Sequence, residues 1–339
     1  MSKPINEVIS DIRFPMCIAV VCIHSAAYTC PPDQWLTTYV LYLLSDYLPA
    51  VAVPCFFLIA GYLSAKRENF KNSSAYVLLL KRRAVSLLLP YVIWNVIAFA
   101  ISWVVNISPL ARFASGNYAN FENFPELLKY LFWEPRLVPL WFVRNLILIT
   151  VASPIVFHAT KKVPVVALIA FYLICCCDEA YFISGLFFYG AGMAARLHMT
   201  SSCLDTCLRH GMWLLPMFLA YALLSAADAI PPEFCNLIDQ PILLAGVIGC
   251  ISICSQTNAS IVKIFRSNGL AFFVYALHGI ITPYIIKSVK IFFHPTNGGA
   301  NLLLFFLTVI ASLTFCVAAY AMMFRYAKPA LKLLIGSRL

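Results

Sequence analysis

The sequence predicts an all-α, polytopic membrane protein: a bundle of about ten transmembrane helices around a central cavity. The first observation is composition, because 62% of the residues are hydrophobic, only 11% are charged and the mean hydropathy is +0.85. Soluble domains are closer to 45–50% apolar and about 25% charged. The second observation is the presence of ten apolar segments, each long enough or nearly long enough to span a bilayer. They are 14–30, 39–64, 84–106, 139–157, 163–178, 181–198, 211–227, 239–255, 270–290 and 300–325.

The first segment resembles a signal peptide in its order of basic and apolar residues, but Arg13 and His24 interrupt it and "SAAYTCPPD" is a poor cleavage site. We therefore expect a retained helix. The second segment contains Pro54. The third segment follows the basic run "KRR". Segments 163–178 and 181–198 are short and are joined only by "CCDEAY". Together the segments form one predicted integral-membrane domain over residues 1–339.

The distribution of charge predicts the orientation. If the N-terminus is cytoplasmic, most of the 24 lysines and arginines fall in cytoplasmic loops, whereas the outer loops are acidic. By the positive-inside rule both termini then lie in the cytoplasm. The net charge of +10 is accounted for by this topology, and no basic stripe on a soluble surface indicates nucleic-acid binding. The expected surroundings are a lipid bilayer.

Arg13 and His24 are the residues least expected in an apolar helix. They are eleven positions apart, which is about 20° more than three full helical turns, so the side chains share a face about 16 Å apart along the axis. We expect Arg13 at the cytoplasmic mouth and His24 near the middle of the membrane. An ionisable group at that depth needs a polar interior, and a neutral imidazole can act as a general base. The alternative is a topology anchor and a packing histidine.

Other polar residues near or within spans are further candidates. Arg82 and Arg83 suit the phosphates of a cytoplasmic ligand, although such clusters often only fix topology. Arg144 lies within a predicted span, where it could contact substrate or form a structural ion pair. His278 could line the cavity or pack. The substrate-binding candidates are therefore Trp141, Arg144, Asn145 and His278.

These features resemble the acyltransferase-3 family of integral-membrane acyltransferases over residues 14–320. The first helix of that family carries an arginine and a histidine at the spacing of Arg13 and His24, and the second an "FFxxSGYL"-like signature. The matching signature residues are Phe56, Phe57, Gly61, Tyr62 and Leu63, with Ala60 in place of serine. The stretches "LLPYVIWN", "LWFVRNL" and "YALHGIITPY" also resemble family landmarks.

The resemblance implies transfer of an acyl group, commonly acetyl, from cytoplasmic acyl-coenzyme A (acyl-CoA) to a carbohydrate hydroxyl at a bacterial cytoplasmic (inner) membrane. Arg13, Arg82 and Arg83 would bind the phosphates of acetyl-CoA, which is a donor substrate and not a permanent cofactor. His24 would deprotonate the hydroxyl of a surface polysaccharide or of its lipid-linked precursor. The chain also resembles the stand-alone members of the family, which act on surface glycans.

A transporter or flippase for such a glycan is the alternative, because transporters also need buried charge and kinked helices. A donor other than acetyl, such as succinyl, also remains open. No metal site is expected, because the 13 cysteines do not show zinc-ligand spacing with histidine.

Overall fold

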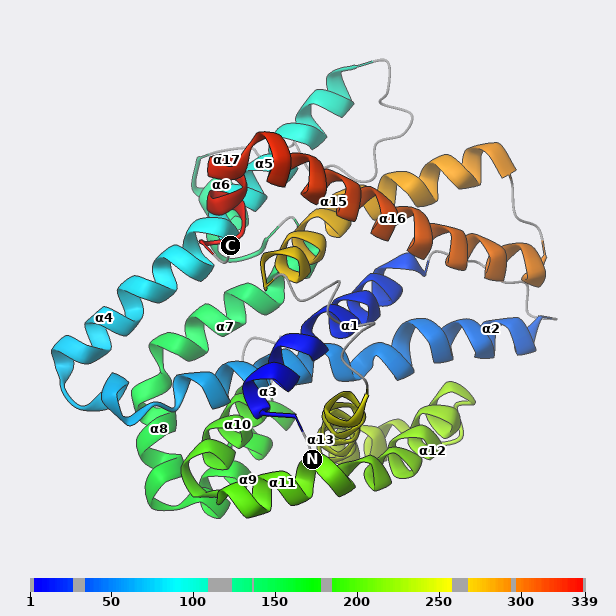
Figure 1. Ribbon diagram of the computed structural model, residues 1–339. Coiled ribbons are helices and arrows are strands. Elements are labelled where there is room, and N and C mark those ends of the chain that lie inside the picture. The colour runs from blue at the N-terminus through cyan, green and yellow to red at the C-terminus, as the bar shows by residue number, and fades with distance from the viewer. Residues whose placement is uncertain are drawn as a thin grey trace. The chain divides into compact units, whose positions relative to one another are not determined.

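The computed structural model describes residues 3–26, 34–108, 124–135, 137–177, 185–257, 268–293 and 297–337. Within these residues all regular secondary structure is helical (Figure 1), which confirms the predicted all-α class. The chain forms two compact units that alternate along the sequence. The first unit comprises Met1–Ala19, Tyr47–Arg83 and Asn145–Arg266, and the second comprises Val20–Asp46, Ala84–Arg144 and Ser267–Leu339. The predicted single domain over residues 1–339 stays a prediction.

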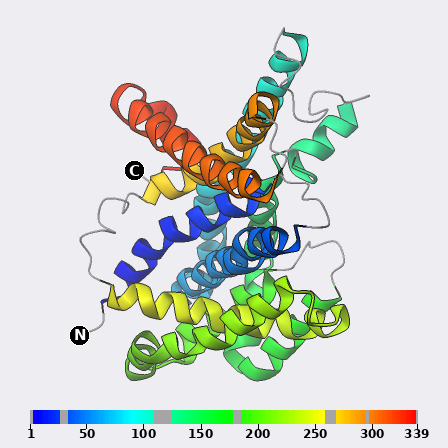
Figure 2. The ribbon, with the colours of Figure 1, turned by 90° about the vertical axis from the view of Figure 1, so that its right-hand side faces the viewer.

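The first unit is built on three helices that pack side by side. Helix α3 (Ala52–Ser64) packs along α10 (Leu186–His198) and also contacts α13 (Pro232–Gln256). In Figure 2, α13 runs beside α11 (Ser201–His210) and α12 (Leu215–Ala226). The remaining helices of this unit are the N-terminal part of α1 (Ile5–Ser25), α4 (Ser73–Arg83), most of α7 (Trp141–Val151), α8 (Ser153–Lys162) and α9 (Pro164–Cys176).

Two glycines explain the close packing of α3 against α10. A Cβ atom at Gly61 would collide with the carbonyl oxygen of Tyr189, and one at Gly192 would collide with that of Leu58. Small residues let helix backbones approach in this way in membrane proteins. The glycine of the "FFLIAGYL" signature is therefore a packing residue at a helix crossing.

We predict that Gly61→Ala and Gly192→Ala each destabilise the protein by about 1–3 kcal/mol or more, because the added methyl group meets backbone that cannot turn aside. Thermal unfolding of the detergent-solubilised protein measures the effect. Gly299→Ala is the matched control, since a Cβ there lies 3.6 Å from its nearest neighbour, Asn297 Oδ1. An unchanged melting temperature in both test variants would contradict this close crossing.

Among the described residues, the second unit contains the C-terminal part of α1 together with six other α-helices. Helix α15 (Asn268–Phe293) packs against α16 (Gly298–Tyr326), which also contacts α2 (Trp35–Tyr42). Helix α5 (Leu89–Ile107) contacts α6 (Phe124–Phe132) and α17 (Lys328–Leu334). The short 3₁₀ turn Val138–Leu140 packs on α15 and positions one wall of the cavity described below.

Among the described residues, seven helices are long and apolar enough to cross a membrane, or eight if one bent pair forms a single span. The protein is therefore a multi-pass membrane protein, with fewer long spans than the approximately ten predicted. The chain bends by 65° between Val138–Val151 and Ser153–Lys162, which replaces the predicted span 139–157. The predicted spans 163–178 and 181–198 correspond to α9 and α10, each 13 residues long. A helix of that length covers about 20 Å, less than the hydrocarbon thickness of about 30 Å.

The first helix begins at Ile5, nine residues before the predicted start of the span. This added N-terminal part of the helix contains a buried ion pair with the residue before it: Lys3 Nζ lies 2.9 Å from Asp11 Oδ2, and Asp11 is only 1% exposed. Because the two charges are paired, this helix can include buried polar residues that a prediction from hydropathy alone would leave outside it. Within this helix Arg13 lies near the middle and His24 lies in the last turn, and the depths expected for them in the membrane stay predictions.

Candidate functional site

Two histidines from distant parts of the sequence meet in the second unit. The rings of His24 on α1 and His278 on α15 have centroids 5.3 Å apart and are tilted by 43°. His24 is half-buried, whereas His278 is fully buried. The structure thus places the predicted base beside one of the predicted substrate-binding residues.

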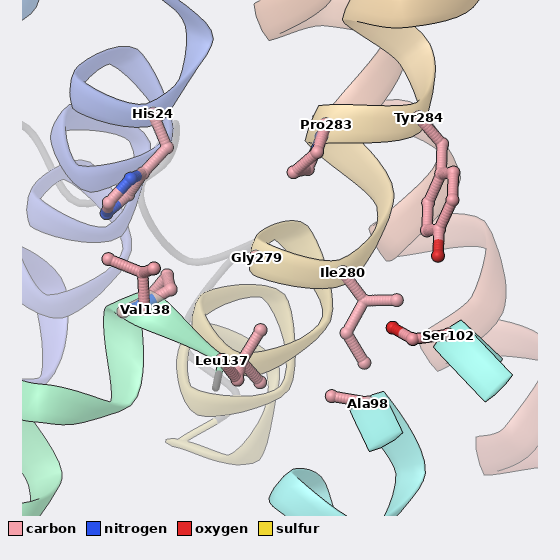
Figure 3. Close-up of a pocket in the computed structure, with 10 residues that line it drawn as sticks. His24, Ala98, Ser102, Leu137, Val138, Gly279, Ile280, Pro283 and Tyr284 are labelled. Carbon is pink, nitrogen blue, oxygen red and sulfur yellow. The ribbon is translucent and has the colours of Figure 1, made fainter. Parts of the chain in front are cut away.

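A cavity of about 150 Å³ opens beside His24. In Figure 3, His24 lies on one side and Ser102 and Tyr284 on the other, with Gly279 and Ile280 of α15 between them. The remaining lining residues are Ala98, Leu137, Val138, Pro139 and Pro283. The walls are mostly apolar and carry an imidazole and two hydroxyl groups. This is the composition of a small-molecule site, in which few polar groups orient the ligand.

The segment before α7 forms a wall of this cavity and is fixed to α15. Tyr275 donates a hydrogen bond to the carbonyl oxygen of Pro139. A Cβ atom at Gly279 would lie 2.8 Å from Leu137 Cδ1 and from Pro139 Cγ, so the missing side chain makes room for this wall. The "YALHGI" stretch therefore supplies the small residue that makes room for this wall, and it also contains the buried histidine beside His24.

The first unit contains a second polar cluster, around two arginines. Arg13 and Arg83 are half-buried and close enough for their charges to interact. Arg83 Nη2 donates to Ser64 Oγ at 3.1 Å, and Arg83 forms no ion pair within the described residues. Two neighbouring guanidinium groups in a partly buried position favour an anionic ligand.

Buried hydroxyl groups in the first unit complete this arginine cluster. Tyr189 is fully buried and interacts electrostatically with Arg83. The hydroxyl of Tyr189 is close enough to those of Ser64, Thr150 and Ser153 to interact with them, but within the part of the chain that the structure describes neither Tyr189 nor the fully buried Ser153 makes a hydrogen bond of normal geometry. Such groups can donate to oxygens of an anion. Isolated serines and tyrosines in apolar helices give no sequence signal, and we did not predict either residue.

The other predicted residues are not gathered at one place. Arg82 is exposed, in contrast to its neighbour Arg83. Arg144 is 9% exposed, and its Nη1 donates to the carbonyl oxygen of Trp133 at 2.7 Å, just beyond the end of α6. This contact gives Arg144 a structural role, since it satisfies a carbonyl that follows a helix C-terminus. Trp141 is half-buried and Asn145 fully buried on the same helix, and their substrate contacts stay predictions.

Sequence reasoning also missed Ser102 and Tyr284, the two hydroxyls opposite His24. Tyr284 ends the "YALHGIITPY" stretch, one turn and a half after His278, so that stretch was the available signal. Ser102 lies in the otherwise apolar "FAISWVV" run, which gives no indication of its role.

An all-helical membrane fold with a histidine facing a small cavity agrees with the class of protein found by comparison. Residues 12–321 match the model of a family described as an acyltransferase domain, and the chain belongs to this acyltransferase-3 family. The chain is also 26% identical over 319 residues to succinoglycan biosynthesis protein ExoH of Rhizobium meliloti (strain 1021). That similarity covers 90% of this chain and 83% of the relative. No solved structure matches the chain.

Proposed function

We propose that the protein is an O-acyltransferase that moves an acetyl group from cytoplasmic acetyl-CoA to a hydroxyl of a surface polysaccharide or its lipid-linked precursor. The observation that carries the proposal is His24, a half-buried imidazole on the wall of a cavity in a chain of the acyltransferase-3 family. The name of the relative refers to succinoglycan, which is a polysaccharide. That name supports a carbohydrate acceptor.

The size of the cavity indicates which parts of the substrates enter it. A volume of about 150 Å³ is comparable to a cavity that holds one benzene molecule. It can therefore accept the thioester end of the donor and the reacting hydroxyl, but not a whole sugar chain. Ser102 and Tyr284 line this space, and their hydroxyls can orient the acceptor by hydrogen bonds (Figure 3).

The reaction needs one base and one acid in succession. His24 removes the proton of the acceptor hydroxyl, and the oxygen attacks the carbonyl carbon of the thioester. The carbon–sulfur bond breaks, and the imidazolium of His24 returns the proton to the sulfur, which releases coenzyme A as its thiol. One neutral histidine can perform both transfers.

The arginine cluster of the first unit, Arg13 and Arg83 with the hydroxyls of Ser64, Tyr189 and Ser153, is the proposed binding site for the donor phosphates. Arginine binds phosphate oxygens through a planar fork of donors, and the partly buried position strengthens each charge-assisted bond. Arg82 contributes from the exposed side of α4. Loop charge favours a chain that spans a bacterial inner membrane with both termini in the cytoplasm. The donor then arrives from the cytoplasm.

The decisive experiment uses the purified full-length protein in lipid nanodiscs with radiolabelled acetyl-CoA and, in parallel, succinyl-CoA. We expect release of free coenzyme A and label on the glycan from acetyl-CoA. Label from succinyl-CoA alone would keep the transferase proposal and change its donor. Comparison of glycan mass and linkage in cells with and without the protein identifies the modified hydroxyl. If neither donor is consumed and the glycan loses no acyl group without the protein, the transferase proposal is wrong. A flippase then becomes the better candidate.

A further inference from the structure

His278 has an unsatisfied ring nitrogen in the interior of the second unit. Its Nδ1 lies 3.1 Å from the carbonyl oxygen of Val274, one helical turn earlier. A carbonyl oxygen can only accept, so Nδ1 carries the hydrogen, and in the neutral ring Nε2 is then the acceptor. Nε2 is buried and has no hydrogen-bond partner among the residues that the structure describes. Buried polar atoms without a partner are rare in folded proteins and require an explanation.

The ring that approaches His278 from α1 is that of His24. With 5.3 Å between their centroids, the two rings can bring one nitrogen of each to a hydrogen-bond length of about 3 Å. A neutral imidazole has one donor and one acceptor. If the donor of His24 points to Nε2 of His278, the other nitrogen of His24 keeps its lone pair for a ligand in the cavity. Half-exposure on the cavity wall leaves the His24 ring room for this orientation.

We propose that His278 is a positioning residue for His24. Its Nε2 accepts a hydrogen bond from the ring N–H of His24 and so fixes the tautomer and orientation of that imidazole. The catalytic meaning of this contact rests on the proposed acyl transfer. When His24 takes the proton of the acceptor hydroxyl, its positive charge is stabilised by the lone pair of His278. The same proton leaves with the sulfur of coenzyme A, and His278 remains neutral throughout.

This role differs from the substrate contact predicted for His278. The ring of His278 is fully buried, and its centroid lies 5.3 Å from that of His24, so a potential donor of the same protein is within reach of its one free acceptor. In serine hydrolases a buried carboxylate holds the histidine base in the correct tautomer. Here a second imidazole would do so without adding a charge to the membrane interior, where charge is costly.

The kinetic test compares His278→Phe, which removes the acceptor, with His278→Gln, whose side-chain oxygen can replace it. We expect kcat to fall roughly 10–100-fold in His278→Phe, as for other partners that orient a histidine, with KM unchanged. His278→Gln should recover part of the loss. In a His24→Ala background, His278→Phe should cause no further loss, because the two residues act as a unit.

Thr282→Val is the matched control. Thr282 is fully buried on α15, one turn after His278, and its hydroxyl donates to Ser312 Oγ. The Thr282→Val substitution removes a buried hydroxyl but changes neither histidine ring, so kcat should stay at the wild-type value. Melting temperatures separate a folding defect from a positioning defect. An unchanged kcat in a folded His278→Phe protein overturns the positioning role and leaves the transferase proposal standing.

A second measurement does not depend on activity. Histidines labelled with ¹⁵N report, by NMR, which ring nitrogen carries the hydrogen. We expect His24 to show a single tautomer in the wild-type protein and an average of two tautomers in His278→Phe. An identical His24 signal in both proteins overturns the inference. A change in that signal in a protein without acyl transfer supports the contact while refuting the proposed function.

Discussion

Replacing His24 with alanine should reduce the rate of acyl transfer by roughly 10²–10⁴-fold, the usual contribution of a general base. The acceptor hydroxyl would keep its proton at neutral pH, and no other histidine borders the cavity among the described residues. Folding should be preserved, because His24 is only half-buried and lies in the last turn of α1. Release of coenzyme A from labelled acetyl-CoA, measured at saturating donor and acceptor, gives the rate.

His158→Ala serves as the control for the loss of a histidine, since this residue is exposed on α8. Its turnover should equal that of the wild-type protein. Near-normal turnover of a correctly inserted His24→Ala protein would exclude His24 as the base. The catalytic group would then have to be sought elsewhere.

Replacing Arg13 or Arg83 with alanine should weaken binding of the acyl-CoA donor by about 10–100-fold, as expected when charge-assisted hydrogen bonds worth about 1.5–3 kcal/mol are lost. The effect should be in the donor KM and in the directly measured Kd, with a smaller effect on kcat. Arg13→Lys should restore only part of the affinity, because an ammonium lacks the planar fork. Arg83→Ala should cost more than Arg82→Ala, because Arg83 is half-buried beside Arg13 and Arg82 is exposed.

Lys81→Ala is the matched control for charge, since Lys81 is exposed on the same helix. Donor affinity should not change in this variant. Equilibrium binding of a non-hydrolysable acyl-CoA analogue to the protein in nanodiscs measures each Kd. Unchanged affinity in both Arg13→Ala and the Arg82/Arg83 double alanine variant would place the donor at a different site.

From the amino-acid sequence alone we could predict the class of the protein and the shared face of Arg13 and His24 on its first helix. Composition and segment length depend only on residues close in sequence, so the multi-pass, all-helical membrane fold could be predicted from them. The spacing of Arg13 and His24 is also local, because a regular helix places side chains eleven residues apart on one face. For the same reason the sequence motifs were sufficient to indicate the family.

Tertiary contacts decided the features that depend on residues far apart in the sequence. The pairing of His24 with His278 joins the first helix to α15, and nothing local to either segment predicts it. Arg82 and Arg83 are adjacent, but successive helical residues point about 100° apart, and only the packed structure shows that Arg83 is close enough to Arg13 for their charges to interact. In each case a side chain's role was decided by its partner, which the local sequence does not contain.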